Sequence, residues 1–183
     1  MDGIITKRIM KNTETAINSA NVADNGCGII AAYNVLHSYS SKITFSSVFN
    51  SFNNPLAFTL GVGVAGIDPV YLTGYMSTHF WLTFPAGPVT YLWGIQAELS
   101  GAVIVLVRWK GSLKMHYFAG ISTGNGGEGG SFKFYNTGLR DKGGSYIDGR
   151  TMSIWGLLDV METGKDLAQP IMLIGVAGKK GWW

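Results

Sequence analysis

Residues 25–36 have the sequence NGCGIIAAYNVL, which is the clearest helix signal in the chain. Asp24 and Asn25 stand at its start, and both residue types favour helix N-caps because their side-chain oxygens accept backbone N–H groups that lack partners. Counted from Cys27, positions 30, 31, 34 and 35 fall on one helical face that is mostly small and apolar. The stretch therefore predicts a buried helix with Cys27 in its first turn.

The rest of the chain divides into a helical half and a half made mainly of strands. Short helices are expected over 44–50, 68–76 and 91–99, and a further one over 153–160. Asp68 suits the N-cap of the second of these helices, and Pro69 suits its first turn. Strands are expected over 102–107, 115–121, 132–136 and 171–176. Helices followed by an antiparallel sheet indicate the α+β class.

Composition limits the kind of protein. The 183 residues are 46% hydrophobic and only 14% charged, which excludes a disordered chain and predicts one domain over 1–183. The net charge of +3 comes from scattered Lys and Arg residues, so no nucleic-acid partner is expected. The one cysteine excludes an internal disulfide framework. Because the three histidines are far apart in the sequence, no metal or cofactor is expected.

No membrane segment is predicted. The longest apolar stretch, 56–67, has 12 residues, whereas a membrane-spanning helix needs about 20. Residues 1–8 lack the apolar core and cleavage site of an export signal. We expect a protein without stable membrane insertion, either cytoplasmic or exported without a recognisable signal peptide. The oligomeric state stays open.

Cys27 and His116 are the first two candidates for chemistry. A thiol in the first turn of a helix feels the positive end of the helix dipole, which favours the thiolate. The alternative is a small buried cysteine without a reaction to perform. His116 lies in an apolar strand, on the face of Lys114, Phe118 and Gly120, and could act as the base. The alternative is a core histidine hydrogen-bonded to a carbonyl.

Asn136 and Asn21 complete the candidate set. Asn136 ends the strand over 132–136, where its carboxamide could accept the imidazole N–H and orient the ring. A turn-forming asparagine before Thr137 explains the same residue. An oxyanion would be stabilised by the Cys27 backbone N–H and by Asn21, six residues upstream. A plain loop asparagine is the alternative for Asn21.

The order of these elements and candidate residues along the chain resembles that of the papain-like superfamily of cysteine peptidases. The resemblance is greatest to the C39-type branch, which includes the bacteriocin-leader peptidases. The resemblance extends over residues 20–176. It rests on the Cys-Gly helix start, on GIDPVYLTGYM at 66–76, on the strand over 101–107, on HYFAGI at 116–121 and on FYN at 134–136. The chain departs from the pattern by having Asn21 where these enzymes place a glutamine. It also has Asn136 where the branch more often has an aspartate.

This resemblance implies a papain-like fold, in which a helical half carrying the cysteine packs on an antiparallel sheet. It implies a thiol hydrolase that cleaves a peptide bond of a peptide or protein through a Cys27 thioester, with His116 as base and then acid and Asn136 as orienting residue. Two alternatives stay open on the same site. One is a side-chain deamidase or transglutaminase, and the other is a papain-fold binding module without turnover. A cell-wall amidase is a further variant.

Overall fold

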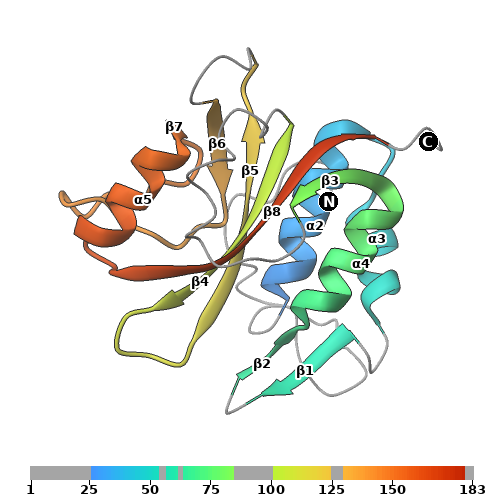
Figure 1. The fold of residues 1–183 in the computed structure, drawn as a ribbon, viewed down its shortest axis with the longest axis horizontal. Helices are drawn as coiled ribbons and strands as arrows, with labels where there is room; N and C mark the ends of the chain where they lie inside the picture. The colour runs from blue at the N-terminus through green and yellow to red at the C-terminus, as the bar shows by residue number, and fades with distance from the viewer. Residues whose placement is uncertain (1–25, 54–56, 62–63, 85–100, 125–129, 180–183) are drawn as a thin grey trace.

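The structure is a computed structural model that describes residues 26–53, 57–61, 64–84, 101–124 and 130–179. A six-stranded antiparallel sheet runs through the molecule in the order β3-β8-β4-β5-β6-β7 (Figure 1). Its strands are β3 (Phe80–Phe84), β4 (Ala102–Trp109), β5 (Met115–Ser122), β6 (Ser131–Tyr135), β7 (Thr151–Ser153) and β8 (Ala168–Lys179). A separate antiparallel pair is formed by β1 (Phe58–Gly61) and β2 (Val64–Ile67).

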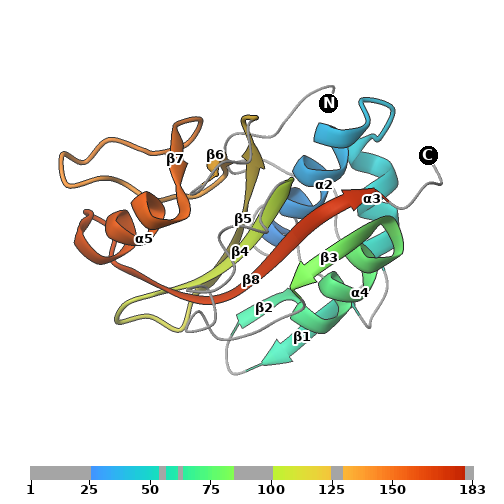
Figure 2. The same cartoon turned by 45° about the horizontal axis from the view of Figure 1, so that its top comes forward.

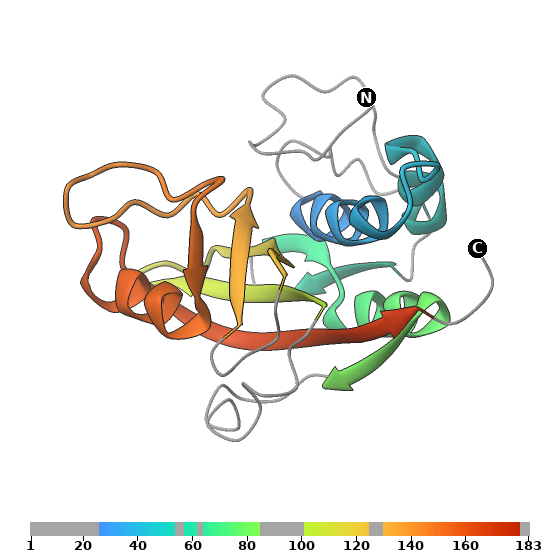
Figure 3. The same cartoon turned by 90° about the horizontal axis from the view of Figure 1, so that it is seen from above.

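Helices cover both faces of the large sheet. Those on one side are α2 (Cys27–Tyr39), α3 (Phe45–Phe52) and α4 (Pro69–His79), and α5 (Ile154–Thr163) is on the other. Figure 2 shows β4, β5 and β8 lying between α5 and this group of three helices. In the view of Figure 3, α2 is drawn above the sheet, and β8, which is one of the strands of that sheet, is drawn below α2. The molecule is therefore α+β, as the sequence predicts.

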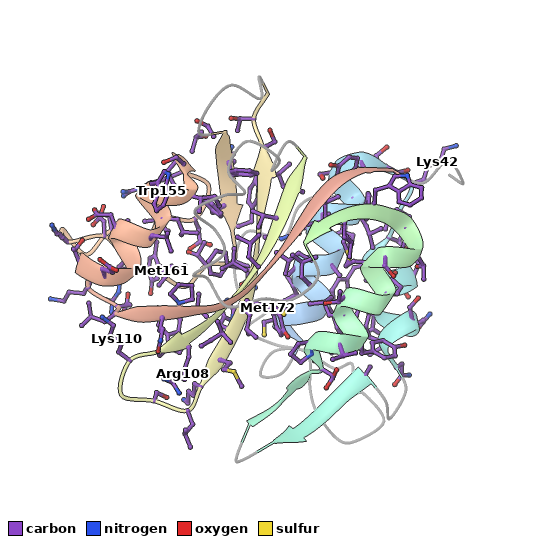
Figure 4. The ribbon with its side chains drawn as sticks, viewed as in Figure 1. Lys42, Arg108, Lys110, Trp155, Met161 and Met172 are labelled. Atoms are coloured by element: carbon purple, nitrogen blue, oxygen red, sulfur yellow. The ribbon has the colours of Figure 1, made fainter. Side chains whose placement is uncertain are left out.

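Strand β4 separates two apolar cores. Its even-numbered residues, such as Ile104, face the core beneath α2, α3 and α4. Its odd-numbered residues, such as Val105, face the core beneath α5. Met172 of β8 belongs to the first core and Met161 of α5 to the second (Figure 4). This division explains the uninterrupted apolar sequence of β4, because a strand buried on both faces has no polar alternation.

Most of the predicted elements are present with small shifts at their ends. Asp68 caps α4 by accepting the amides of Val70 and Tyr71 at 2.8 and 2.9 Å, and Ser153 caps α5 by accepting the amide of Gly156 at 3.1 Å. Four strands, β1, β2, β3 and β7, were not predicted, and the first three of them lie in the half that was expected to be helical. The helix expected over 91–99 lies outside the described residues. Over the part of the chain that the structure describes, no helix has the length and apolar character needed to cross a membrane.

Candidate active site

Cys27 is the first residue of α2. The residue before it, Gly26, is the N-cap and has no side chain to bond the exposed amides of the first turn. The cap expected from Asp24 or Asn25 is therefore replaced by Gly26, and those two residues lie outside the described ones. Within the helix, the first backbone bond runs from the Ile30 amide to the Gly26 carbonyl at 3.0 Å. Cys27, a partly buried residue, thus has its thiol at the positive end of the helix dipole.

The start of α2 is held against β5 by close contacts through Ile67. A Cβ atom on Gly28 would lie 2.7 Å from the Cβ of Ile67, so only glycine allows this approach. The buried Tyr117 hydroxyl of β5 donates to the Ile67 carbonyl at 3.3 Å. Burial, followed by the negative charges of Cys27 and Asp68, raises the pKa of Tyr117, so that it stays a neutral donor. These contacts fix the distance between the helix start and the strand that carries His116.

The Cys27 thiol and the His116 imidazole face each other closely enough for each to stabilise the charged form of the other. Burial of the thiol favours its neutral form, but His116 and the backbone amides of Tyr117 and Gly28 stabilise the thiolate, and the net effect lowers the pKa of Cys27. Burial likewise disfavours the imidazolium, but the Cys27 thiolate, the Asn136 carbonyl and Asp148 outweigh it and raise the pKa of His116. Each pKa shift favours the charged form of its group, so the two shifts together favour a thiolate–imidazolium pair.

The His116 ring is fixed from its other side by Asn136. Its Nε2 lies 2.5 Å from the main-chain oxygen of Asn136. Because a carbonyl oxygen only accepts hydrogen bonds, Nε2 carries a proton, which leaves Nδ1 to face the thiol. The ring also neighbours those of Trp109 and Phe118, whose centroids are 6.5 and 6.4 Å away. The contact with Phe118 agrees with the strand alternation predicted for His116.

Asn136 contributes its backbone to this contact, and the prediction that its carboxamide would meet the imidazole is not what the structure places there. The regular strand ends at Tyr135, and Asn136 has a φ of 59°, in the left-handed region that asparagine tolerates better than most residues. This conformation turns the chain so that the carbonyl, rather than the side chain, meets the imidazole. The residue is 4% exposed. The two interpretations of Asn136, as turn former and as histidine partner, therefore apply together.

Thr137 and Asp148 belong to the same network and were not predicted from the sequence. The Asp148 carboxylate accepts the Thr137 amide at 2.7 Å and the Thr137 hydroxyl at 3.1 Å. Thr137 is fully buried, and its hydroxyl oxygen also accepts the Leu139 amide at 3.2 Å. In the sequence, Asp148 precedes Gly149 and looks like an ordinary turn residue.

The remaining candidates lie apart from the pair or outside the described residues. Asn21, the expected oxyanion residue, lies outside them. His37 is at the far end of α2, where its Nδ1 lies 2.9 Å from the Ile43 carbonyl. His79 ends α4 and has its ring 4.9 Å from that of Tyr75. Of the three histidines, the structure brings His116 to the cysteine.

The described residues contain no group of three or more His, Cys, Asp or Glu side chains that could hold a metal ion. Comparison of the chain with protein-family models, curated proteins and solved structures finds no match to any of them. A thiolate beside an imidazolium, at the N-terminus of a helix, can attack a carbonyl carbon and protonate the leaving group.

Proposed function

We propose that this protein is a papain-like thiol hydrolase that cleaves peptide bonds of a peptide or protein substrate. The observation that carries the proposal is the juxtaposition of Cys27 and His116 at the start of a helix, where the pKa of the cysteine is lowered and the pKa of the histidine is raised. A structural cysteine in an apolar core has the opposite shift, because burial alone favours the neutral thiol.

The reaction that fits these residues has two stages. The Cys27 thiolate attacks the carbonyl carbon of the substrate, a C–S bond forms, and the C–N bond breaks as the His116 imidazolium gives its proton to the leaving nitrogen. Neutral His116 then takes a proton from water, the resulting hydroxide attacks the thioester carbon, and the C–S bond breaks to return the thiolate. The Asn136 carbonyl keeps the ring in the tautomer that presents Nδ1 to the sulfur.

The oxyanion formed in the first stage needs hydrogen-bond donors. The Cys27 amide is one candidate, because the first amides of a helix have no acceptor within it. Asn21 is the proposed second donor. It is one methylene shorter than the glutamine that papain-like enzymes have at this position, so its contribution is a separate question from that of the Cys27–His116 pair.

The proposal can be tested with a mixture of peptides obtained by digesting a whole proteome. The wild-type protein is expected to produce new peptide termini that mass spectrometry detects, and Cys27→Ala is expected to produce none. His116→Gln should lose the activity, while His37→Gln, which changes a histidine at the far end of the same helix, should retain it.

Other results would redirect or overturn the proposal. A Cys27-dependent conversion of glutamine to glutamate without new termini would assign the site to side-chain amides. If no peptide changes and Cys27 forms no adduct with a peptide vinyl sulfone, the fold acts as a binding module and the proposal is wrong.

A further inference from the structure

The peptide group between Asn136 and Thr137 connects the imidazole to a carboxylate. On one side its carbonyl oxygen lies 2.5 Å from Nε2 of His116, and on the other its N–H donates to Oδ1 of Asp148 at 2.7 Å. A peptide group is planar and its N–H and C=O dipoles are aligned. A negative charge at the N–H end therefore increases the negative charge on the oxygen that faces the histidine.

The Asp148 carboxylate is held in a defined orientation. Its second oxygen accepts the Thr137 hydroxyl at 3.1 Å, so one residue binds both carboxylate oxygens. Backbone hydrogen bonds hold the residues on both sides of Asp148. The Ile147 amide donates to the Leu139 carbonyl at 3.1 Å, and the Gly149 amide donates to the Phe134 carbonyl at 2.7 Å. The position of the carboxylate relative to the peptide group is thus set by the fold.

Within the described part of the chain, Asp148 forms no ion pair that would neutralise this charge. Two nearby arginines, Arg140 and Arg150, pair with Asp166 and Asp141 at 2.7 and 2.6 Å. Lys133 of β6 lies beside Gly149, but its ammonium group lies over the Tyr135 ring, 5.9 Å from the ring centre, and does not pair with Asp148. On the other side of His116, the ionisable group that faces the ring is Cys27 of α2.

We propose that Asp148 is a positioning residue of the site, which holds the Asn136–Thr137 peptide group with its carbonyl toward His116 and stabilises the imidazolium through it. This inference rests on the proposed function, in which the imidazolium is the proton donor. The carboxylate never touches the ring, so its action is transmitted through one amide.

The test is an NMR titration of the three histidine rings in the full-length protein, because it needs neither substrate nor turnover. Asp148→Asn keeps an oxygen for the Thr137 amide but removes the charge. We expect the imidazole pKa of His116 to fall by about 0.5 to 1 unit, a three- to tenfold change in its protonation equilibrium. Asp159→Asn removes the same charge from an exposed position of α5 and should leave that pKa unchanged.

A second pair of variants covers the case in which Asp148→Asn does not fold. Thr137→Val removes the hydroxyl that binds Oδ2, and we expect a smaller decrease of the same pKa, while Thr137→Ser should match the wild type. A His116 pKa within 0.1 unit of the wild-type value, in whichever of Asp148→Asn and Thr137→Val folds, overturns the proposal. A lowered pKa in a protein that cleaves no peptide would uphold this inference and contradict the proposed function alone.

Discussion

The main-chain oxygen of Asn136 accepts the Nε2 proton of His116 at 2.5 Å. The histidine is thus oriented by a backbone group, and the left-handed conformation of Asn136 places that group. The carbonyl belongs to the backbone, so any residue at position 136 can provide it, whereas the carboxamide is lost when Asn136 is replaced. Substitutions of Asn136 can therefore distinguish the two groups.

Asn136→Gly should keep the site intact. Glycine adopts a positive φ without steric cost, so the carbonyl stays where it is and the iodoacetamide reactivity of Cys27 should remain within about threefold of wild type. Asn136→Val places a β-branched side chain at a φ of 59° and should lower the free energy of unfolding by about 1–2 kcal/mol. Chemical denaturation and alkylation rates measure the two effects. A loss of reactivity in a folded Asn136→Gly protein would assign the role to the carboxamide.

Gly28→Ala should disturb the site through packing. The added Cβ would lie 2.7 Å from the Cβ of Ile67, so the start of α2 must move away from β2 and β5. We expect a loss of about 1–3 kcal/mol in the free energy of unfolding, together with slower alkylation of Cys27.

The matched control for this substitution is Gly74→Ala, in the middle of α4. A Cβ there has no neighbour within 4 Å, and alanine favours a helix interior over glycine by about 1 kcal/mol, so this variant should be more stable than wild type. Thermal unfolding compares the two. Equal effects of Gly28→Ala and Gly74→Ala would contradict the close packing at Gly28.

Local signals account for what could be predicted of the fold. The Asp68-Pro69 pair and Ser153 have the chemistry of helix starts, and the continuous apolar sequence of β4 marks a strand between two layers. Strand β3 has no comparable signal, because its partner β8 lies almost a hundred residues further along the chain. The pairing of β1 with β2 follows from tertiary contacts as well, since Ile67 must meet Gly28 and Tyr117.

The residues of the candidate site likewise include some that local sequence signals indicate and some that they do not. Cys27 stands out because it is the one cysteine and begins a helix of small residues, and His116 stands out as a polar residue in an apolar strand. Asp148 could not be recognised, because an aspartate before a glycine is common in turns and its distance from Thr137 depends on the whole 137–148 loop. Which atom of Asn136 meets the imidazole depends on one backbone angle that the residue types leave open.

Substitution of Tyr117 should have a small effect on stability. Tyr117→Phe removes the hydroxyl that donates to the Ile67 carbonyl at 3.3 Å but keeps the ring and the backbone amide that faces the Cys27 sulfur. We expect a loss of about 0.5–1.5 kcal/mol in stability and little change in thiol reactivity. A large loss of reactivity without a loss of stability would give the hydroxyl a direct role in the reaction.

The raised pKa of His116 predicts how the site responds to alkaline pH. The imidazolium should persist above pH 6.5, the ordinary value for histidine, and should disappear as the pH rises through the higher pKa of the folded protein. Iodoacetate carries a negative charge that the imidazolium attracts, whereas iodoacetamide is neutral. The ratio of their rates with Cys27 should therefore stay high at pH 6.5 and fall only at higher pH. A ratio that is already low at pH 6.5 would contradict the ion pair.

If His116 keeps Cys27 as a thiolate, the thiol stays reactive at acidic pH, and the rate at which iodoacetamide alkylates Cys27 at pH 6 measures this. Because Cys27 is the one cysteine of the chain, intact-mass spectrometry follows the reaction without interference. We expect wild-type protein and His37→Gln to react much faster than free cysteine, and folded His116→Gln to react at least about tenfold more slowly than wild type. A wild-type rate no higher than that of free cysteine, or an unchanged rate in His116→Gln, would contradict a thiolate maintained by His116.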